Sequence, residues 1–111
     1  VWGMMRLTTI GRKSGRERVA ILGYYEDGPN LVTMAMNGWG APEPAWWLNL
    51  QAHPETTVQL HDRTVQVRGR PATPDERPRL WELWRTYDGE ELDGWAARRP
   101  HETAVVILEP R

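Results

Sequence analysis

Residues 4–25 read MMRLTTIGRKSGRERVAILGYY and contain two strand-like runs separated by a turn. Met4 to Ile10 is apolar and rich in threonine, and Arg18 to Tyr25 is a second run of β-forming residues. The glycines at positions 11 and 15 bracket Arg12-Lys13-Ser14, as is typical of a turn. The stretch therefore predicts an antiparallel strand pair, and it favours a fold built from hairpins.

The remaining strand-like segments follow the same plan. Asp27-Gly28-Pro29-Asn30 predicts a hairpin turn into a third strand over Leu31 to Met36. Thr57 to Leu60 and Thr64 to Arg70 predict another antiparallel pair, and Ala104 to Leu108 predicts a last buried strand. We therefore expect about six mostly antiparallel strands.

Two or three helices are expected beside these strands. Pro44 suits the first turn of a helix over Ala45 to Ala52. Thr73 and Glu76 have the spacing of a capping box, with Thr73 as the N-cap of a second helix. The apolar stripe of that helix consists of Leu80, Leu83, Trp84 and Tyr87. Glu90 to Arg99 predicts a short third helix, so the fold class is α+β, an antiparallel sheet or small barrel with flanking helices.

The composition limits the class of protein. A chain of 111 residues supports one core, so residues 1–111 are expected to form a single domain. Cysteine is absent, which excludes disulfides and thiol catalysis and fits a reducing, cytoplasmic compartment. The net charge of -1 argues against nucleic acid as a partner. Because the chain begins at Val1 rather than Met, we expect that an N-terminal segment is missing before it.

Positive charge is concentrated near the N-terminus. Within residues 1–24 the cations are Arg6, Arg12, Lys13, Arg16 and Arg18. Set against the one anion, Glu17, they give a local charge of about +4, which suits a small anionic ligand. The Gly-flanked turn presents backbone N–H groups, a hydroxyl and two cations, as a phosphate or carboxylate requires. A solvated surface turn explains the same residues equally well, so both interpretations stay open.

A second candidate site begins at Asn37-Gly38-Trp39-Gly40. A tryptophan between glycines lets the backbone approach a flat ligand, so we expect Trp39 to be functional. Trp46 and Asn49 share one face of the predicted helix, where an aromatic wall and an amide could line a pocket. For Trp47 we expect packing of the helix onto the sheet.

Other catalytic groups are not convincing. Ser14 is the only serine and has no adjacent histidine, and the three histidines lack metal-ligand spacing. The acidic run Glu90, Glu91 and Asp93 is typical of a solvated helix end. We therefore expect no catalytic side chain and no metal, and infer that a bound cofactor performs the chemistry.

Three segments together resemble one known family. They are Leu7 to Gly15 (LTTIGRKSG) with Arg18, Pro44 to Pro54 (PAWWLNLQAHP), and Val105 to Pro110 (VVILEP). In this order and at these spacings they resemble the deazaflavin-dependent nitroreductase family of actinobacteria. The resemblance implies a split β-barrel like that of the FMN-binding pyridoxamine-phosphate oxidases. It also implies reduced coenzyme F-420, a deazaflavin with a phosphate and an oligoglutamate tail.

The resemblance also implies residue roles. Residues implied at the phosphate and tail are Arg12, Lys13, Ser14 and Arg18. Residues implied along the deazaflavin ring and its side chain are Ile21, Met34, Met36, Asn37, Gly38, Trp39, Gly40, Ala45 and Trp46. Trp95 is implied at the substrate. The implied reaction is hydride transfer to an electron-poor acceptor such as a quinone, a nitroaromatic compound or an unsaturated ketone.

Two alternatives stay open at this point. One is the same barrel with FMN as the cofactor. The other is a non-catalytic module that binds an anionic cofactor or RNA, which would lose RNA affinity steeply with salt. Related barrels often dimerise, so a homodimer is a further expectation. Membrane association is expected only through the N-terminal segment, which in relatives can be an amphipathic helix.

Overall fold

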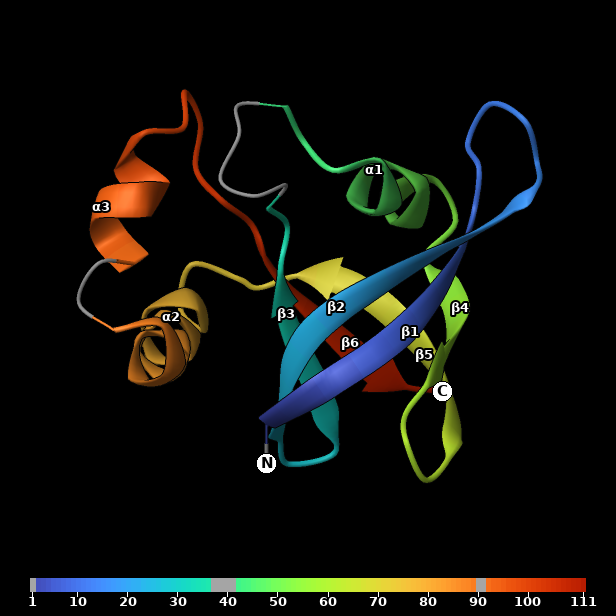
Figure 1. Ribbon diagram of the computed structural model, residues 1–111, viewed down its shortest axis with the longest axis horizontal. Coiled ribbons are helices and arrows are strands. Elements are labelled where there is room, and N and C mark those ends of the chain that lie inside the picture. Colours follow the sequence, from blue (N-terminus) through green and yellow to red (C-terminus); the bar gives the residue numbers. More distant parts are fainter. Residues whose placement is uncertain (1, 37–41, 90–91) are drawn as a thin grey trace.

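The computed structural model describes residues 2–36, 42–89 and 92–111. Six strands in these residues close into an antiparallel barrel in the order β1-β2-β3-β6-β5-β4 (Figure 1). The strands are β1 (Trp2–Ile10), β2 (Glu17–Asp27), β3 (Asn30–Met34), β4 (Glu55–Gln59), β5 (Thr64–Pro71) and β6 (Val105–Pro110). Pairing of β1 with β4 closes the barrel, which removes the free sheet edges. The predicted α+β barrel is confirmed.

The β1–β2 hairpin is the longest pairing of the barrel. The two strands pair from Trp2 and Tyr25 through to Ile10 and Glu17. At the turn, the Gly11 N–H donates to the Arg16 carbonyl at 2.8 Å, and the Gly15 N–H donates to the Gly11 carbonyl at 2.8 Å. Gly15 has a φ of 71°, in the left-handed region that glycine adopts without strain. The predicted strand pair and its turn are confirmed.

Some strand ends differ from the sequence prediction. β3 ends at Met34 rather than Met36, because its pairing with β6 stops where Met34 faces Val105. β4 begins at Glu55 rather than Thr57, since Glu55 pairs with Arg68. Cross-strand partners therefore decide where each strand ends, and local residue preferences do not reveal them.

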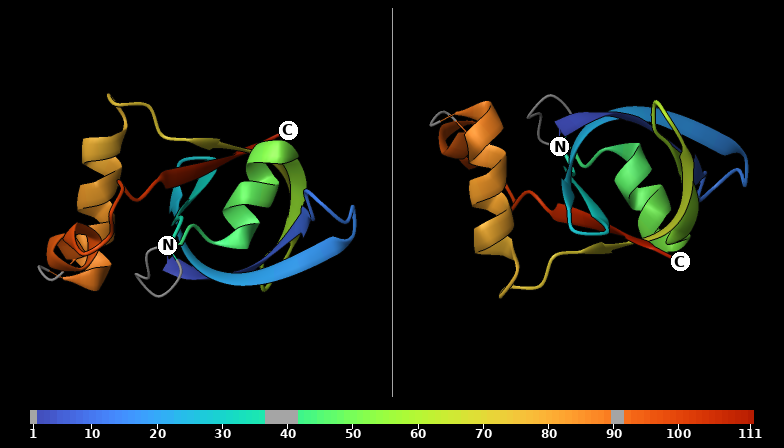
Figure 2. Two further views of the ribbon diagram at one scale, coloured as in Figure 1. Left: turned by 90° about the horizontal axis from the view of Figure 1, so that it is seen from above. Right: turned by 90° about the horizontal axis from the view of Figure 1, so that it is seen from below.

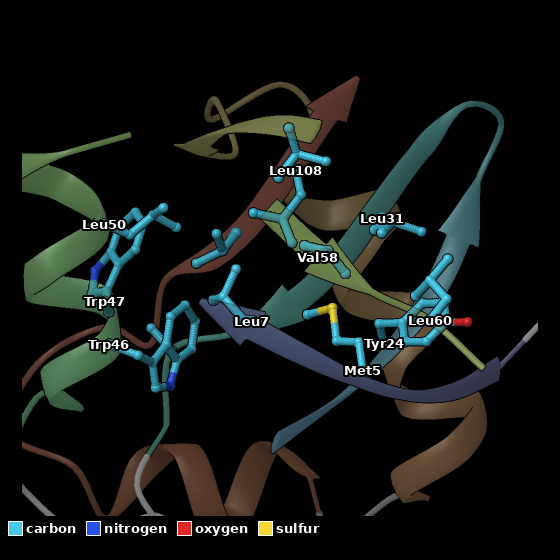
Figure 3. Packing of buried hydrophobic residues seen from close by; sticks show 13 residues of the cluster. Met5, Leu7, Tyr24, Leu31, Trp46, Trp47, Leu50, Val58, Leu60 and Leu108 are labelled. Atoms are coloured by element: carbon cyan, nitrogen blue, oxygen red, sulfur yellow. The ribbon is translucent and has the colours of Figure 1, made fainter. Parts of the chain in front are cut away.

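Helix α1 (Ala45–Ala52) has the predicted bounds and lies across one end of the barrel (Figure 2). Its side chains Trp46, Trp47 and Leu50 join the core formed by the strands (Figure 3). Gly69 on β5 makes this approach possible, because a Cβ there would lie 2.5 Å from Leu50 Cδ2. The predicted packing role of Trp47, which is 3% exposed, is confirmed.

Helices α2 (Arg77–Asp88) and α3 (Leu92–Ala97) stand beside the barrel and cover a second core cluster (Figure 2). Leu80 and Trp84 of the predicted stripe are buried there, and Leu83 packs against them. The side chain of Tyr87 and residue Glu90 lie outside the described parts. The Tyr25 hydroxyl donates to the Leu80 carbonyl at 2.8 Å, which fixes α2 against the barrel.

The capping-box prediction needs a correction. Thr73 and Glu76 do exchange hydrogen bonds, from Thr73 N–H to Glu76 Oε1 at 2.9 Å and from Glu76 N–H to Thr73 Oγ1 at 3.3 Å. However, α2 begins at Arg77 with Glu76 as its N-cap, so the box closes a separate turn before the helix. Pro78 has no N–H to donate to Pro74, which interrupts helical bonding between the two.

We expect Glu76→Gln to make the free energy of unfolding depend less steeply on pH in the acidic range. Hydrogen bonds from Arg70 and Thr73 lower the pKa of Glu76 from 4.5 to about 2. A carboxylate with a lowered folded-state pKa stabilises the fold above its unfolded pKa and loses this effect as the pH falls through its folded pKa. The variant should be less stable at pH 7, by about 1 kcal/mol or less because the pair is partly exposed.

Urea unfolding at pH 7, 4 and 3 checks this expectation. The difference between wild type and Glu76→Gln should narrow as the pH falls from 4.5 toward 2, the range set by the two pKa values. A difference that stays constant over this range would contradict the assigned role of the Glu76 charge.

Candidate functional site

A pocket of about 570 Å³ is lined by the β1–β2 turn and the first turns of α1. Figure 1 shows α1 and the β1–β2 turn at the same end of the barrel. Its wall combines residues from the turn, from both strands and from the helix entry. They are Thr9, Gly11, Arg12, Lys13, Ser14, Arg18, Val19, Ala20, Pro44, Ala45, Trp46 and Asn49. The volume lies in the range of small-molecule sites, about 300–1,000 Å³.

Strand alternation turns one face of the hairpin toward α1. Thr9 pairs with Arg18 and Leu7 pairs with Ala20, so these residues share one face. Leu7 is fully buried on that face and Thr9 is 1% exposed. Arg18 stands at the outer end of the same face, where it reaches the pocket rim without entering the core.

Asn49 joins the cationic turn to α1. Its Oδ1 accepts hydrogen bonds from the Arg12 backbone N–H at 3.1 Å and from Arg12 Nη1 at 2.9 Å. Its Nδ2 donates to Thr9 Oγ1 at 3.4 Å, and Asn49 itself is 3% exposed. This buried amide therefore holds the turn in register with the helix and fixes the mouth of the pocket.

The pocket carries positive charge that acidic side chains do not neutralise. Arg12, Lys13 and Arg18 all line it, and none of them forms an ion pair within the part of the chain that the structure describes. Other arginines behave differently, since Arg70 pairs with Glu76 and Arg79 pairs with Asp27. The pocket cations are therefore available to an anionic ligand.

Ser14 supports the turn as well as lining the pocket. Its Oγ accepts a hydrogen bond from the Arg16 N–H at 3.2 Å. A Cβ at Gly11 would lie 2.6 Å from this oxygen, so the present position of the Ser14 hydroxyl depends on glycine there. Arg16 is exposed and lies outside the pocket lining.

Six sequence-predicted site residues meet at this pocket: Arg12, Lys13, Ser14, Arg18, Ala45 and Trp46. The predicted shared pocket face of Trp46 and Asn49 is confirmed. Trp46 lines the pocket and is also part of the core cluster, since only 8% of the residue is exposed.

Other predicted site residues lie elsewhere. Met34 is buried in the second core cluster, and Ile21 is 56% exposed and lines a shallow pocket with Met4. Met36 is half-buried after β3, and Trp95 is half-buried on α3. Neither of these two lines the pocket described above. Their ligand contacts, like those of Ile21 and Met34, stay predictions. Asn37, Gly38, Trp39 and Gly40 lie outside the described residues.

Sequence reasoning missed part of the pocket wall. Thr9, Val19 and Ala20 were not singled out, although alternation with Leu7 could have indicated Thr9 and Ala20. The contact of Asn49 with Arg12 had no sequence signal, because the two residues are 37 positions apart.

The described residues contain neither a cluster of metal ligands nor a helix suited to span a membrane. No group of three or more His, Cys, Asp or Glu side chains is placed to hold a metal ion among them. Nor does any helix in the same residues combine the length and apolar composition needed to cross a membrane.

Asn49→Ala is expected to lower the free energy of unfolding by about 1–3 kcal/mol, since it leaves the buried Thr9 hydroxyl and the Arg12 N–H without their partner. Urea unfolding measures the loss. Gln51→Ala is the matched control, because Gln51 is exposed on the same helix. Equal stability of both variants would contradict the role assigned to Asn49.

Comparison with known proteins gives similarity over nearly the whole chain. A family model described as F420H(2)-dependent quinone reductase matches residues 2–110. The Mycobacterium tuberculosis protein Rv3178, named for that activity, is 35% identical over 102 residues, which cover 90% of this chain and 83% of Rv3178.

Solved structures agree with this similarity. The structure of an F420-H2 dependent reductase, FDR-A, matches with a TM-score of 0.83 and 25% identity, over 96% of this chain and 93% of that chain. A second structure, described as a domain-swapped dimer, has the same TM-score and identity and covers 96% of this chain and 79% of its own.

Proposed function

Because the chain belongs to the F420H(2)-dependent quinone reductase family, we propose that it is an oxidoreductase that uses reduced coenzyme F-420 to reduce a quinone. The observation that carries this proposal is the pocket between the β1–β2 turn and α1. There, three cations without acidic partners among the described residues stand beside an aromatic wall. Such a pocket suits a ligand with an anionic part and a flat part.

The donor groups of the pocket fit the chemistry of this coenzyme. A phosphate and a glutamate tail require cations and N–H donors, which Arg12, Lys13 and Arg18 supply. Ser14 adds a hydroxyl. The start of α1 lies in the same wall, and the exposed N–H groups of a helix N-terminus favour anions.

The apolar part of the wall fits a flat ring. Trp46, Ala45 and Ala20 contribute aromatic and aliphatic surface to the pocket wall. Trp46 is held by the core beneath it, so its orientation is set before a ligand binds. These side chains would orient a ring and exclude water from one of its faces.

Coenzyme F-420, when bound, supplies a hydride to the acceptor. The chain itself supplies binding and orientation, in keeping with a pocket lining that contains no Asp, Glu, His or Cys among the described residues. We propose a quinone as the acceptor because the family description specifies it. Nitroaromatic compounds and unsaturated ketones are the further acceptors to be screened.

A titration of the purified protein with coenzyme F-420, and in parallel with FMN, tests the proposal. Quenching of tryptophan fluorescence reports binding, because Trp46 lies in the pocket wall. We expect micromolar or tighter binding of coenzyme F-420 and weaker binding of FMN. A preference for FMN would keep the barrel and change the cofactor, and no response to either would contradict the proposal.

A second assay separates an enzyme from a carrier protein. Oxidation of reduced coenzyme F-420 by a quinone is followed with and without the protein. An enzyme accelerates the oxidation, whereas a non-catalytic module binds the coenzyme and leaves the rate unchanged. Unchanged rates across a panel of quinones would therefore contradict the proposed activity.

We also propose that the protein forms a homodimer. The support is the structural neighbour described as a domain-swapped dimer. Light scattering coupled to gel filtration measures the mass directly, and a mass of 12.8 kDa, that of one chain, would contradict the dimer.

A further inference from the structure

Arg99 is a buried cation outside the pocket. Its side chain is 0% exposed and forms an ion pair with Glu43, at 2.8 Å between Nη2 and Oε1. Nη1 donates to the Ala35 carbonyl at 2.9 Å and to Thr103 Oγ1 at 2.8 Å. Nη2 also lies 3.5 Å from the Pro42 carbonyl. One guanidinium therefore connects three separate segments of the chain.

One of these segments follows a barrel strand, and another leads into the pocket wall. Ala35 directly follows β3, and Glu43 directly precedes Pro44, the N-cap of α1. The Pro44 carbonyl accepts hydrogen bonds from the N–H groups of Trp47 at 3.1 Å and Leu48 at 3.3 Å. Glu43, the ion-pair partner of Arg99, therefore lies one residue before the N-cap of α1.

The first turn of α1 is also part of the pocket wall. Pro44, Ala45 and Trp46 all line it. A displacement of Glu43 would be passed to these residues through the buried Pro44. Arg99 is therefore placed to set the position of the wall, although it is not one of the described residues that line the pocket.

The third segment contains Arg99 itself and connects the ion pair with Glu43 to α3. The Arg99 N–H donates to the Ala96 carbonyl at 3.1 Å, and the Arg98 N–H donates to the Trp95 carbonyl at 3.2 Å. Arg99 consequently belongs to the turn that ends α3, the helix that carries Trp95. It joins the predicted substrate residue to the entry of α1.

A buried guanidinium holds its neighbours tightly. Removing a charge from water is costly unless carboxylates and carbonyls replace the lost hydration. Glu43, Ala35 and Thr103 supply this replacement, and each has to stay in place for the charge to be tolerated. Loss of Arg99 would in turn leave the Glu43 carboxylate and the Ala35 carbonyl without this donor.

We propose that Arg99 is a positioning residue that fixes the first turn of α1 and thereby the Ala45–Trp46 wall of the pocket. The identity of the ligand rests on the proposed function, whereas the effect on α1 does not. Arg99 acts through Glu43 and Pro44 and has no contact with the pocket in the described residues.

The test compares Arg99→Met with Arg77→Met. Arg77 is the matched control because its Nη1 donates to the Thr103 carbonyl at 2.6 Å, yet it contacts neither Ala35 nor Glu43 in the described residues. The first readout is hydrogen exchange of the Trp47 and Leu48 amides without coenzyme. The second is the Kd of coenzyme F-420 by tryptophan quenching.

We expect Arg99→Met to raise amide exchange at Trp47 and Leu48, and the Kd of coenzyme F-420, by about tenfold or more, because the first helical turn opens more often. Arg77→Met should leave both within about twofold, even where it lowers the unfolding temperature. Arg99→Lys should be intermediate, since an ammonium keeps the charge but lacks the planar fork that serves several acceptors.

Unchanged exchange in Arg99→Met would overturn the proposal, and so would faster exchange with an unchanged Kd. Should Arg99→Met fail to fold, Glu43→Gln keeps the size and removes the ion pair, and it must raise both readouts for the proposal to stand. A wild-type protein that does not bind coenzyme F-420 would contradict the proposed function alone. The exchange experiment would still decide the role of Arg99 in positioning α1.

Discussion

Lys13→Ala combined with Arg18→Ala is expected to weaken coenzyme F-420 binding by at least about 3 kcal/mol, a rise in Kd of more than about 100-fold. Both side chains line the pocket, and neither has an acidic partner within the described residues. Their removal therefore takes two charge-assisted contacts from an anionic ligand. The Kd is measured by tryptophan quenching, and urea unfolding establishes that the variant is folded.

A control variant with the same change in net charge distinguishes direct contact from general attraction. Arg6→Ala combined with Arg16→Ala also removes two cations from the β1–β2 hairpin, but neither side chain lines this pocket. The control should raise the Kd only slightly, and the effect should fade at high salt because it is long-range. Unchanged affinity in the Lys13 and Arg18 double variant, with the fold intact, would contradict the phosphate-binding assignment.

Trp47→Ala is expected to lower the free energy of unfolding by about 3–5 kcal/mol, the range for truncating a large aromatic side chain in a core. Trp47 is 3% exposed and packs in the cluster between α1 and the barrel strands (Figure 3). Its ring centroid lies 6.2 Å from that of Trp46. Urea unfolding followed by circular dichroism measures the loss.

Ile21→Ala is the control for this prediction. Ile21 is 56% exposed on the outer face of β2, so its truncation should change the free energy of unfolding by about 0.5 kcal/mol or less. Where Trp47→Ala is too unstable to purify, Trp47→Phe should show a smaller loss in the same direction. A loss below about 1 kcal/mol for Trp47→Ala would contradict its assignment to the core.

Several elements of the fold could be predicted because their signals are local. The strand-turn-strand pattern of residues 4–25 contains both the alternation and the turn chemistry of the β1–β2 hairpin. The proline at position 44 and the one at position 54 bracket α1, whose bounds match the prediction. A motif such as LTTIGRKSG also indicates the family, because its residue types and spacing lie within one segment.

Other features depend on partners that are distant in the chain. The ends of β3 and β4 follow from where cross-strand pairing stops. The capping box lies before α2 because Pro78 interrupts the helix that its pattern predicts. In each case the local residue preference indicates the type of element. Cross-strand pairing or backbone hydrogen bonding then sets the residue at which that element begins or ends.

Local sequence patterns are sufficient to predict the antiparallel plan, the cationic turn and the family to which these residues belong. They do not show which cations share a wall with Trp46, nor that Asn49 contacts Arg12 and Arg99 contacts Glu43, which follow from the folded chain. These contacts join residues that are 37 and 56 positions apart. Closing the barrel and burying α1 brings them together, whereas no local preference encodes a hydrogen bond between distant segments.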